Sequence, residues 1–287
     1  MATFGKSIRL YLMDGKPNGR WMCELSNWTG KAYKLPRTML KECEKRSDLR
    51  SSGVYFLFGT DDDSGKPLVY IGETEDIITR LYQHLDSKDY WTEAVVFVTT
   101  DDHLNKAHIK HLENRFYTIA TEAKRYIVKN GNIPKKSSIS EAEQAELEEF
   151  IFNAELLMTT LGHRVFEPII DTDKTAAAES LLHFIRNKGS GGKAEGKLTS
   201  EGFVVMMGSY IYPKIADYVS PGIKDAREKY ASIINAYGIL QEDVLFSSPS
   251  FASTFVCGKN SNGLAEWKDD NGISLKELEA KVTEVAD

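Results

Sequence analysis

Residues 53–72 read GVYFLFGTDDDSGKPLVYIG, in which two apolar runs rich in aromatic residues flank a polar segment. β-Branched and aromatic residues are enriched in strands, whereas clusters of Gly, Pro, Asp and Ser favour turns. We therefore predict strands at residues 53–59 and 68–72, joined by a turn into an antiparallel hairpin. Tyr55 and Tyr70 lie near the middle of the two strands, so the hairpin is expected to carry two phenols.

The residues after the hairpin predict a helix with two more polar groups. Asp76 is a suitable N-cap for a helix that continues to Leu85. Arg80 and His84 lie four residues apart, and residues at this spacing share one face of a helix.

A carboxylate is predicted on the core-facing side of the next helix. After a strand at residues 94–99, apolar residues at helical spacing predict a long helix from residue 105 to about 128. Glu113 falls on its apolar stripe, four residues after Ile109 and three before Phe116. A buried carboxylate is costly unless it is paired or bound to a metal ion.

These polar groups suit a phosphodiesterase site. Glu113 could hold one divalent metal ion, Arg80 could offset the charge of the phosphate, and a phenol or imidazole could take the proton of the attacking water. Each group also has a structural interpretation. Tyrosines on strands usually pack, an Arg and a His four apart often form a solvated face, and Glu113 could pair with Arg80 for structure alone.

The order and spacing favour the functional interpretation. Gly53-Val54-Tyr55, then Tyr70-Ile71-Gly72, then Arg80, His84 and a helical Glu113 resemble the GIY-YIG nuclease family over about residues 50–135, with Val54 where the family's name has Ile. The resemblance implies a small three-stranded antiparallel sheet flanked by helices. It also implies a phosphodiesterase that depends on magnesium or manganese.

The same resemblance assigns roles to individual residues. It makes Glu113 the metal ligand and Arg80 the contact to the scissile phosphate. Tyr55 or Tyr70 would be the general base or would position the water, with Tyr55 preferred as the base, and His84 would assist. The family also carries an Asn after the Glu helix, a nucleic-acid-binding role that fits Asn132, with Asn130 as the alternative.

Three further histidines, His103, His108 and His111, lie near the start of the long helix. Two of them are three residues apart, but they lack the Glu-x-x-His arrangement of a metal site. We expect a solvent-exposed helix face here rather than a metal cluster.

Composition restricts the class of protein. The chain has 287 residues, 41% hydrophobic and 27% charged, a net charge of −6 and three widely spaced cysteines. These values exclude a fibrous or wholly disordered chain, and the cysteine pattern excludes a disulfide framework. No apolar run is long enough for a membrane helix and the N-terminus lacks a signal-peptide pattern, so we expect a reduced, cytoplasmic protein without membrane contact. Residues 1–136 carry a balance of +4 and the remainder −10, which permits nucleic-acid contact in the first half.

The rest of the chain predicts flanking elements and a second domain. We expect an N-terminal hairpin and short helix at 1–49, the nuclease domain at 50–136, a helical connector at 137–187, a flexible linker at 188–199 and a C-terminal α+β domain at 200–287. Ser140 and Glu143 form a capping-box pattern at the start of the first connector helix. A second connector helix is expected at about 175–186, and a short strand at 264–267.

The C-terminal part carries a second resemblance. Residues 247–253 (SSPSFAS), then Gly258, Asn262-Gly263 and Trp267-Lys268, resemble a small domain of unknown function that is often fused behind GIY-YIG domains. This resemblance implies no activity, and target recognition or protein interaction is its expected role.

Together these observations predict an α+β protein that is a metal-dependent DNA endonuclease with Mg²⁺ or Mn²⁺ as cofactor, with a role in restriction, defence or repair. RNA is not excluded as the substrate, and the oligomeric state stays open. The alternative is a non-catalytic binding module that retains the same fold as a nucleic-acid or protein platform.

Overall fold

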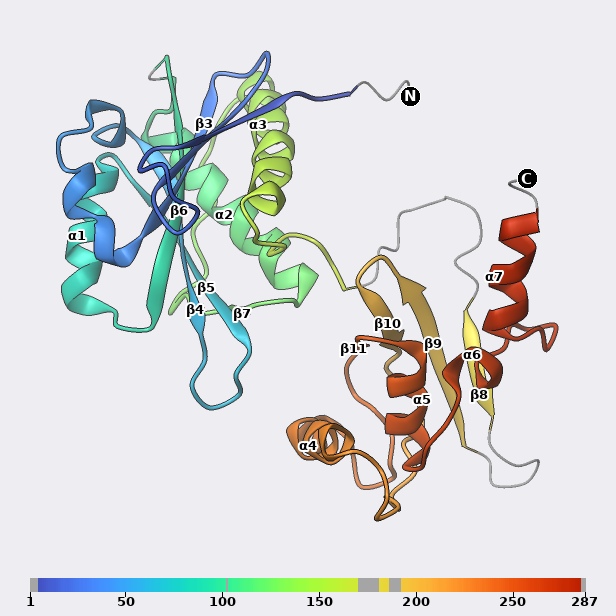
Figure 1. The fold of residues 1–287 in the computed structure, drawn as a ribbon. Helices are drawn as coiled ribbons and strands as arrows, with labels where there is room; N and C mark the ends of the chain where they lie inside the picture. Colours follow the sequence, from blue (N-terminus) through green and yellow to red (C-terminus); the bar gives the residue numbers. More distant parts are fainter. Residues whose placement is uncertain (1–4, 102, 170–180, 186–191, 285–287) are drawn as a thin grey trace. The chain divides into compact units, whose positions relative to one another are not determined.

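The computed structural model describes residues 5–101, 103–169, 181–185 and 192–284 (Figure 1). The chain divides into two compact units, residues 1–168 and 169–287. Each unit has its own sheet and its own hydrophobic core. The predicted α+β class is therefore confirmed, with one mixed arrangement in each unit.

A seven-stranded sheet, counted over the described residues, forms the centre of the first unit. Its strand order is β1-β2-β3-β6-β4-β5-β7, and all neighbours are antiparallel except β5 and β7. The strands are β1 (Ile8–Leu12), β2 (Trp21–Leu25), β3 (Gly30–Pro36), β4 (Gly53–Thr60), β5 (Pro67–Thr74), β6 (Trp91–Thr99) and β7 (Ile127–Val128).

The predicted hairpin is confirmed as β4 and β5. The two strands pair along their whole length, with Tyr55 opposite Gly72 and Leu57 opposite Tyr70. Strand β6 pairs on the other side of β4, so β5, β4 and β6 reproduce the predicted three-stranded antiparallel arrangement.

Helices cover both faces of this sheet (Figure 1). Helices α2 (Lys106–Ala123) and α3 (Glu141–Thr160) pack on the face that carries Val54, Phe56 and Phe97. Helix α1 (Ile77–Ser87) and the 3-10 turns η1 (Arg37–Met39), η2 (Lys41–Cys43) and η3 (Ser47–Leu49) pack on the opposite face. Because side chains alternate along a strand, β4 sends Tyr55 toward α1 and Phe56 toward α2.

Side-chain caps begin the helices at the predicted positions. The Asp76 carboxylate accepts from the Thr79 N–H at the start of α1, and Asn105 caps α2 in the same way. Ser140 and Glu143 form the predicted capping box of α3. Such caps satisfy backbone donors that the helix itself leaves unpaired.

The first 49 residues depart from the prediction of a separate extension. Strand β3 lies between β2 and β6, so the N-terminal hairpin belongs to the same sheet as the hairpin β4–β5. The short helix expected within residues 1–49 is instead a series of 3-10 turns, with bonds such as Cys43 N–H to the Leu40 carbonyl. This tight winding buries Leu40, Cys43 and Leu49 at roughly three-residue spacing against the sheet.

Helix α2 is shorter than the expected 105–128. It ends at Ala123, and Lys124 adopts a left-handed conformation. The chain then pairs with the edge of β5 as strand β7, where tertiary pairing overrides the helical pattern.

The second unit is built on a four-stranded antiparallel sheet, counted over the described residues, in the order β11-β10-β9-β8. Its core gathers around Phe203, Phe255 and Trp267. The elements are β8 (Leu182–Ile185), β9 (Lys193–Thr199), β10 (Gly202–Val205), α4 (Pro221–Lys229), η4 (Ala231–Ile233), β11 (Val244–Phe246), α5 (Pro249–Cys257), α6 (Gly263–Glu266) and α7 (Leu275–Glu284).

Three predictions for this unit need correction. Residues 182–185 of the second connector helix form strand β8, while its residues 175–180 lie outside the described residues. Residues 193–199 of the expected linker form β9, and residues 188–191 lie outside the description; pairing with β8 and β10 on both sides gives β9 its backbone partners. The strand expected at 264–267 is helix α6.

Candidate functional site

Three of the predicted site residues form one hydrogen-bonded chain. The Tyr55 oxygen lies 2.8 Å from His84 Nε2, and Arg80 Nε donates to the same oxygen over 3.2 Å. Because Arg80 already donates to this oxygen, the phenol can direct its own proton to His84. Arg80 and His84 reach Tyr55 from one face of α1, as their spacing predicts.

A glycine makes room for the phenol. Gly72 lies opposite Tyr55 in the β4–β5 pair, and a Cβ atom at Gly72 would overlap the Tyr55 ring and its oxygen. The missing side chain thus lets the Tyr55 ring lie across β5 toward α1.

Tyr70 completes an aromatic cluster with the same residues. Its ring centre is 6.3 Å from that of Tyr55 and 5.5 Å from that of His84. The Lys88 ammonium lies 4.3 Å from the Tyr70 ring centre, which is a cation–π contact. Tyr70 is half-buried, whereas Tyr55 is only 1% exposed.

Burial and charge set the protonation of these groups. Burial is the largest cause that raises the pKa of Tyr55 above its ordinary value, so the phenol is protonated at neutral pH. Burial, followed by the charges of Arg80 and Lys88, lowers the pKa of His84 to about 4. A neutral imidazole therefore faces a protonated phenol.

Glu113 is a half-buried carboxylate on α2 for which the described residues supply no hydrogen bond or ion pair. Its pKa is raised to about 7, chiefly by burial and then by the negative charge of Glu73, while Lys106 and Arg80 oppose the shift. The pairing with Arg80 that the structural interpretation allowed is therefore a charge effect, without a contact.

Glu73 and Lys106 are functional candidates that sequence reasoning missed. Lys106 Nζ lies 3.0 Å from Glu73 Oε2, and the Glu73 side chain is 14% exposed. Glu73 directly follows Gly72 in the hairpin, so its position beside the motif was the available signal. Lys88 was also missed, and nothing in its local sequence marks it.

The two asparagines after α2 have different environments. Asn130 donates to the Ile71 carbonyl over 2.7 Å and accepts from the Ile71 N–H over 3.1 Å, which anchors this segment to β5. Asn132 is exposed, and the structure does not bring it into contact with the Tyr55–His84–Arg80 chain. Asn130 is thus a structural residue, and the nucleic-acid role of Asn132 stays a prediction.

Glu113 is the carboxylate that the predicted divalent cation would require. No group of three or more His, Cys, Asp or Glu side chains that could hold a metal ion occurs among the described residues. Magnesium, however, is commonly bound through one or two carboxylates together with water and substrate phosphate. A carboxylate without a protein partner, as at Glu113, has the chemistry of such a ligand.

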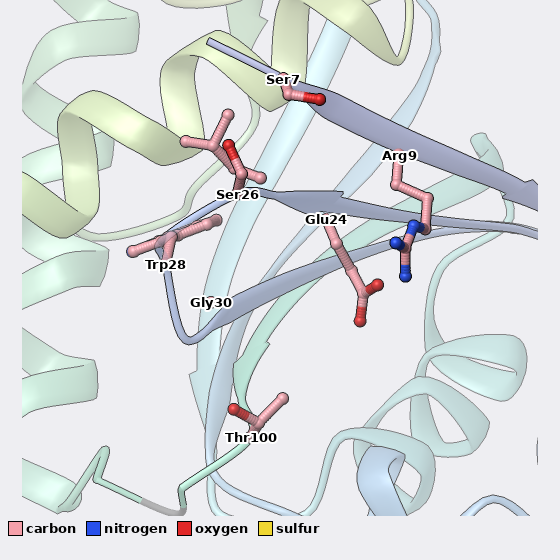
Figure 2. Close-up of a pocket in the computed structure, with 8 residues that line it drawn as sticks. Ser7, Arg9, Glu24, Ser26, Trp28, Gly30 and Thr100 are labelled. Atoms are coloured by element: carbon pink, nitrogen blue, oxygen red, sulfur yellow. The ribbon is translucent and has the colours of Figure 1, made fainter.

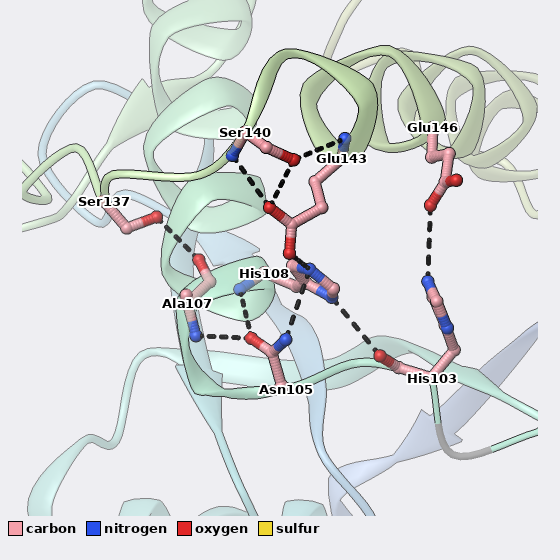
Figure 3. Close-up of polar contacts among 8 residues, drawn as sticks. All are labelled: His103, Asn105, Ala107, His108, Ser137, Ser140, Glu143 and Glu146. Carbon is pink, nitrogen blue, oxygen red and sulfur yellow. Dashed lines mark hydrogen bonds and ion pairs between the residues drawn. The ribbon is translucent and has the colours of Figure 1, made fainter.

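The prediction that His103, His108 and His111 lie on a solvent-exposed helix face is wrong for two of the three. His108 and His111 are 4% and 0% exposed, whereas His103 is exposed. The His108 Nε2 lies 3.1 Å from the Glu143 carboxylate, and its Nδ1 faces the His103 carbonyl (Figure 3). The residues that cap α2 and α3 thus both contact the His108 imidazole. This contact depends on the packing of α3, so the local sequence does not predict it. For His111, burial lowers the pKa.

The pocket in Figure 2 is separate from these residues. It has a volume of about 300 Å³ and is lined mainly by β1, β2 and the turn before β3, with none of the predicted site residues in its lining. Its polar lining includes Arg9, Glu24 and Thr100.

The three cysteines are buried, and none of them forms a disulfide. Of the helices in the described part of the chain, none combines the length and apolar character that crossing a bilayer requires.

Comparison with known proteins gives one family match. Neither the comparison with curated proteins nor that with solved structures found a match. The prediction of a C-terminal domain of unknown function is confirmed, although the domain begins about 16 residues earlier than expected. Residues 184–279 match the model of a family described as Domain of unknown function (DUF4357).

Proposed function

We propose that residues 53–132 form a metal-dependent phosphodiesterase site of the GIY-YIG nuclease type, which cleaves DNA. The observation that carries the proposal is the position of the Tyr55 phenol between His84 and Arg80. Buried polar side chains usually serve structure. Here, however, a neutral proton acceptor, His84, and a cation, Arg80, both contact the oxygen of one proton donor, the Tyr55 phenol.

The protonation states support a proton path. A free phenol with a pKa of about 10 is a poor base near neutrality, and burial makes Tyr55 poorer still. Neutral His84 can accept the Tyr55 proton as Tyr55 takes a proton from the attacking water. Arg80 stabilises the negative charge that develops on the phenol oxygen. Tyr70, which is more exposed, is suited to orient the water.

Charge stabilisation is the second element of the proposal. Arg80 would contact the scissile phosphate, because a guanidinium matches phosphate geometry. Glu113 would hold Mg²⁺ or Mn²⁺, and the ion when bound would offset charge on the phosphate. Without a metal ion, burial holds the pKa of Glu113 above its ordinary value; a bound cation would favour the ionised carboxylate and lower that pKa.

The proposed substrate is DNA, with RNA as a tested alternative. The positive balance of residues 1–136 supports contact with phosphates. We assign the DUF4357 domain a role in choosing the target, and place the activity in restriction, defence or repair inside the cell.

A cleavage assay with three variants tests the proposal. Supercoiled plasmid, modified phage DNA and a labelled RNA are incubated with the full chain in Mg²⁺ and then Mn²⁺. Tyr55→Phe and Arg80→Ala should each lower the cleavage rate by about 10²-fold or more. Tyr82→Phe, the same substitution as Tyr55→Phe but at a tyrosine on α1 outside the hydrogen-bonded chain, should cut like wild type. Binding without cleavage, equal in all variants, would instead support the non-catalytic platform.

A further inference from the structure

Arg37 binds the C-terminal end of α1 from the N-terminal part of the sheet. It is the first residue of η1 and follows directly after β3. Its guanidinium donates to the Lys88 carbonyl over 2.6 Å and to the Leu85 carbonyl over 2.9 Å. The last carbonyls of a helix have no partners within the helix, and a cation there is favoured by the helix dipole.

The same guanidinium lies on a buried ring. Its central carbon is 4.6 Å from the Trp91 ring centre, and Trp91 is 1% exposed. The Trp91 indole N–H in turn points at the His84 carbonyl, 3.4 Å away. Arg37 therefore contacts both the end of α1 and the ring that supports the backbone of His84.

These contacts continue into the candidate site. Lys88, whose carbonyl Arg37 holds, stacks its ammonium on Tyr70, and His84 bonds to Tyr55. We infer that Arg37 is a positioning residue, which fixes the end of α1 and thereby the orientation of His84 and Lys88 toward the two phenols. The inference rests on the proposed function for its catalytic consequence, but its structural part has a separate readout.

That readout is the imidazole of His84. The charged and titratable groups that face it are Arg80 of α1, Lys88 directly after α1, Tyr55 of β4 and Tyr70 of β5. Loss of the Arg37 contacts would release the end of α1, admit water to His84 and let the Lys88 ammonium move away. All three changes favour the imidazolium.

The experiment measures the His84 pKa by NMR in the full chain, with the signal assigned from a His84→Asn variant. Arg37→Ala should raise this pKa by about one unit or more, and Arg37→Lys, which keeps the charge but not the paired geometry, by less. Arg125→Ala is the matched control: Arg125 also donates to two carbonyls, those of Glu167 and Pro168, and its loss should leave His84 unchanged.

Plasmid cleavage supplies the second measurement. With the site mispositioned, Arg37→Ala should lower kcat by about tenfold or more, with a smaller change in KM. A His84 pKa equal to that of wild type in a folded Arg37→Ala protein overturns the inference. If circular dichroism shows that this variant is unfolded, Arg37→Lys decides by the same criterion. A shifted pKa in a protein that cuts no nucleic acid supports the positioning role and counts against the nuclease.

Discussion

The Tyr55 phenol can lie where it does because Gly72 has no side chain. A methyl group at this position would overlap the ring, which is held among β5, His84 and Arg80. Packing around the phenol therefore requires a glycine at Gly72, whether or not the protein has any activity.

We expect Gly72→Ala to destabilise the protein by about 1–3 kcal/mol, because a buried ring must move to admit the methyl group. Urea unfolding at pH 7 measures the change. Gly131→Ala is the control, since Gly131 has no neighbour within 4 Å of an added Cβ. Equal loss in the two variants would contradict the close packing of Gly72 on Tyr55.

Glu113 makes a prediction about stability and pH. Its pKa is raised from 4.5 to about 7, so its ionised form destabilises the fold above pH 7, and the effect disappears below pH 4.5, where the carboxyl is protonated in both states. In the absence of divalent metal, Glu113→Gln should therefore be more stable than wild type by about 1–3 kcal/mol at pH 8 and equal to it near pH 4.

Thermal unfolding at a series of pH values measures this difference. Glu122→Gln, at an exposed glutamate on the same helix, is the control for the loss of a negative charge from α2. A difference between wild type and Glu113→Gln that is constant with pH would mean that Glu113 does not titrate as assigned.

At the scale of elements, β3 joins the N-terminal strands to the candidate site. It pairs with β6 over seven positions, from Gly30 opposite Thr99 to Pro36 opposite Glu93. Without β3, β6 would become an exposed apolar edge strand, which favours aggregation.

We therefore expect a protein lacking residues 1–49 to be insoluble or to unfold without cooperativity, although it keeps the whole of the quoted hairpin. Expression, size-exclusion chromatography and thermal unfolding measure this. A soluble, cooperatively folded residue 50–287 protein would show that the first strands are dispensable.

The elements predicted correctly are those whose turn residues or helix caps lie next to them in the sequence. The hairpin β4–β5 followed from its two aromatic-rich apolar runs and the turn residues between them, and the starts of α1 and α3 followed from Asp76 and Ser140. Strand β3 was missed because Lys31 and Lys34 interrupt its apolar pattern, and its pairing with β6 supplies the missing signal.

The same limit applies to the candidate site. Tyr55, Arg80 and His84 were brought together correctly because one hairpin and one helix place them. The burial of His111 and the binding of Arg37 to the end of α1 depend on contacts between elements that are distant in sequence. The spacing of apolar residues along the sequence does not indicate such contacts.

At the scale of the whole molecule, separate cores imply two folding units. The two buried clusters of residues 1–168, one on each face of the sheet, share no residue with the cluster of residues 169–287, and the DUF4357 match lies entirely within the second unit. Fragments 1–168 and 169–287 should each unfold cooperatively, with midpoints close to the transitions of the full chain. Differential scanning calorimetry measures them. A fragment that is unfolded alone would show that its core needs the other unit.

We have proposed that the first unit hydrolyses DNA through a site that contains Glu113. The most direct test of this proposal is nicking of supercoiled plasmid by purified full chain in Mg²⁺, next to Glu113→Gln and the Glu122→Gln control. We predict nicked or linear product with wild type and Glu122→Gln, and none with Glu113→Gln. Equal cutting by all three proteins, or DNA binding without cutting in Mg²⁺ and in Mn²⁺, would contradict the account.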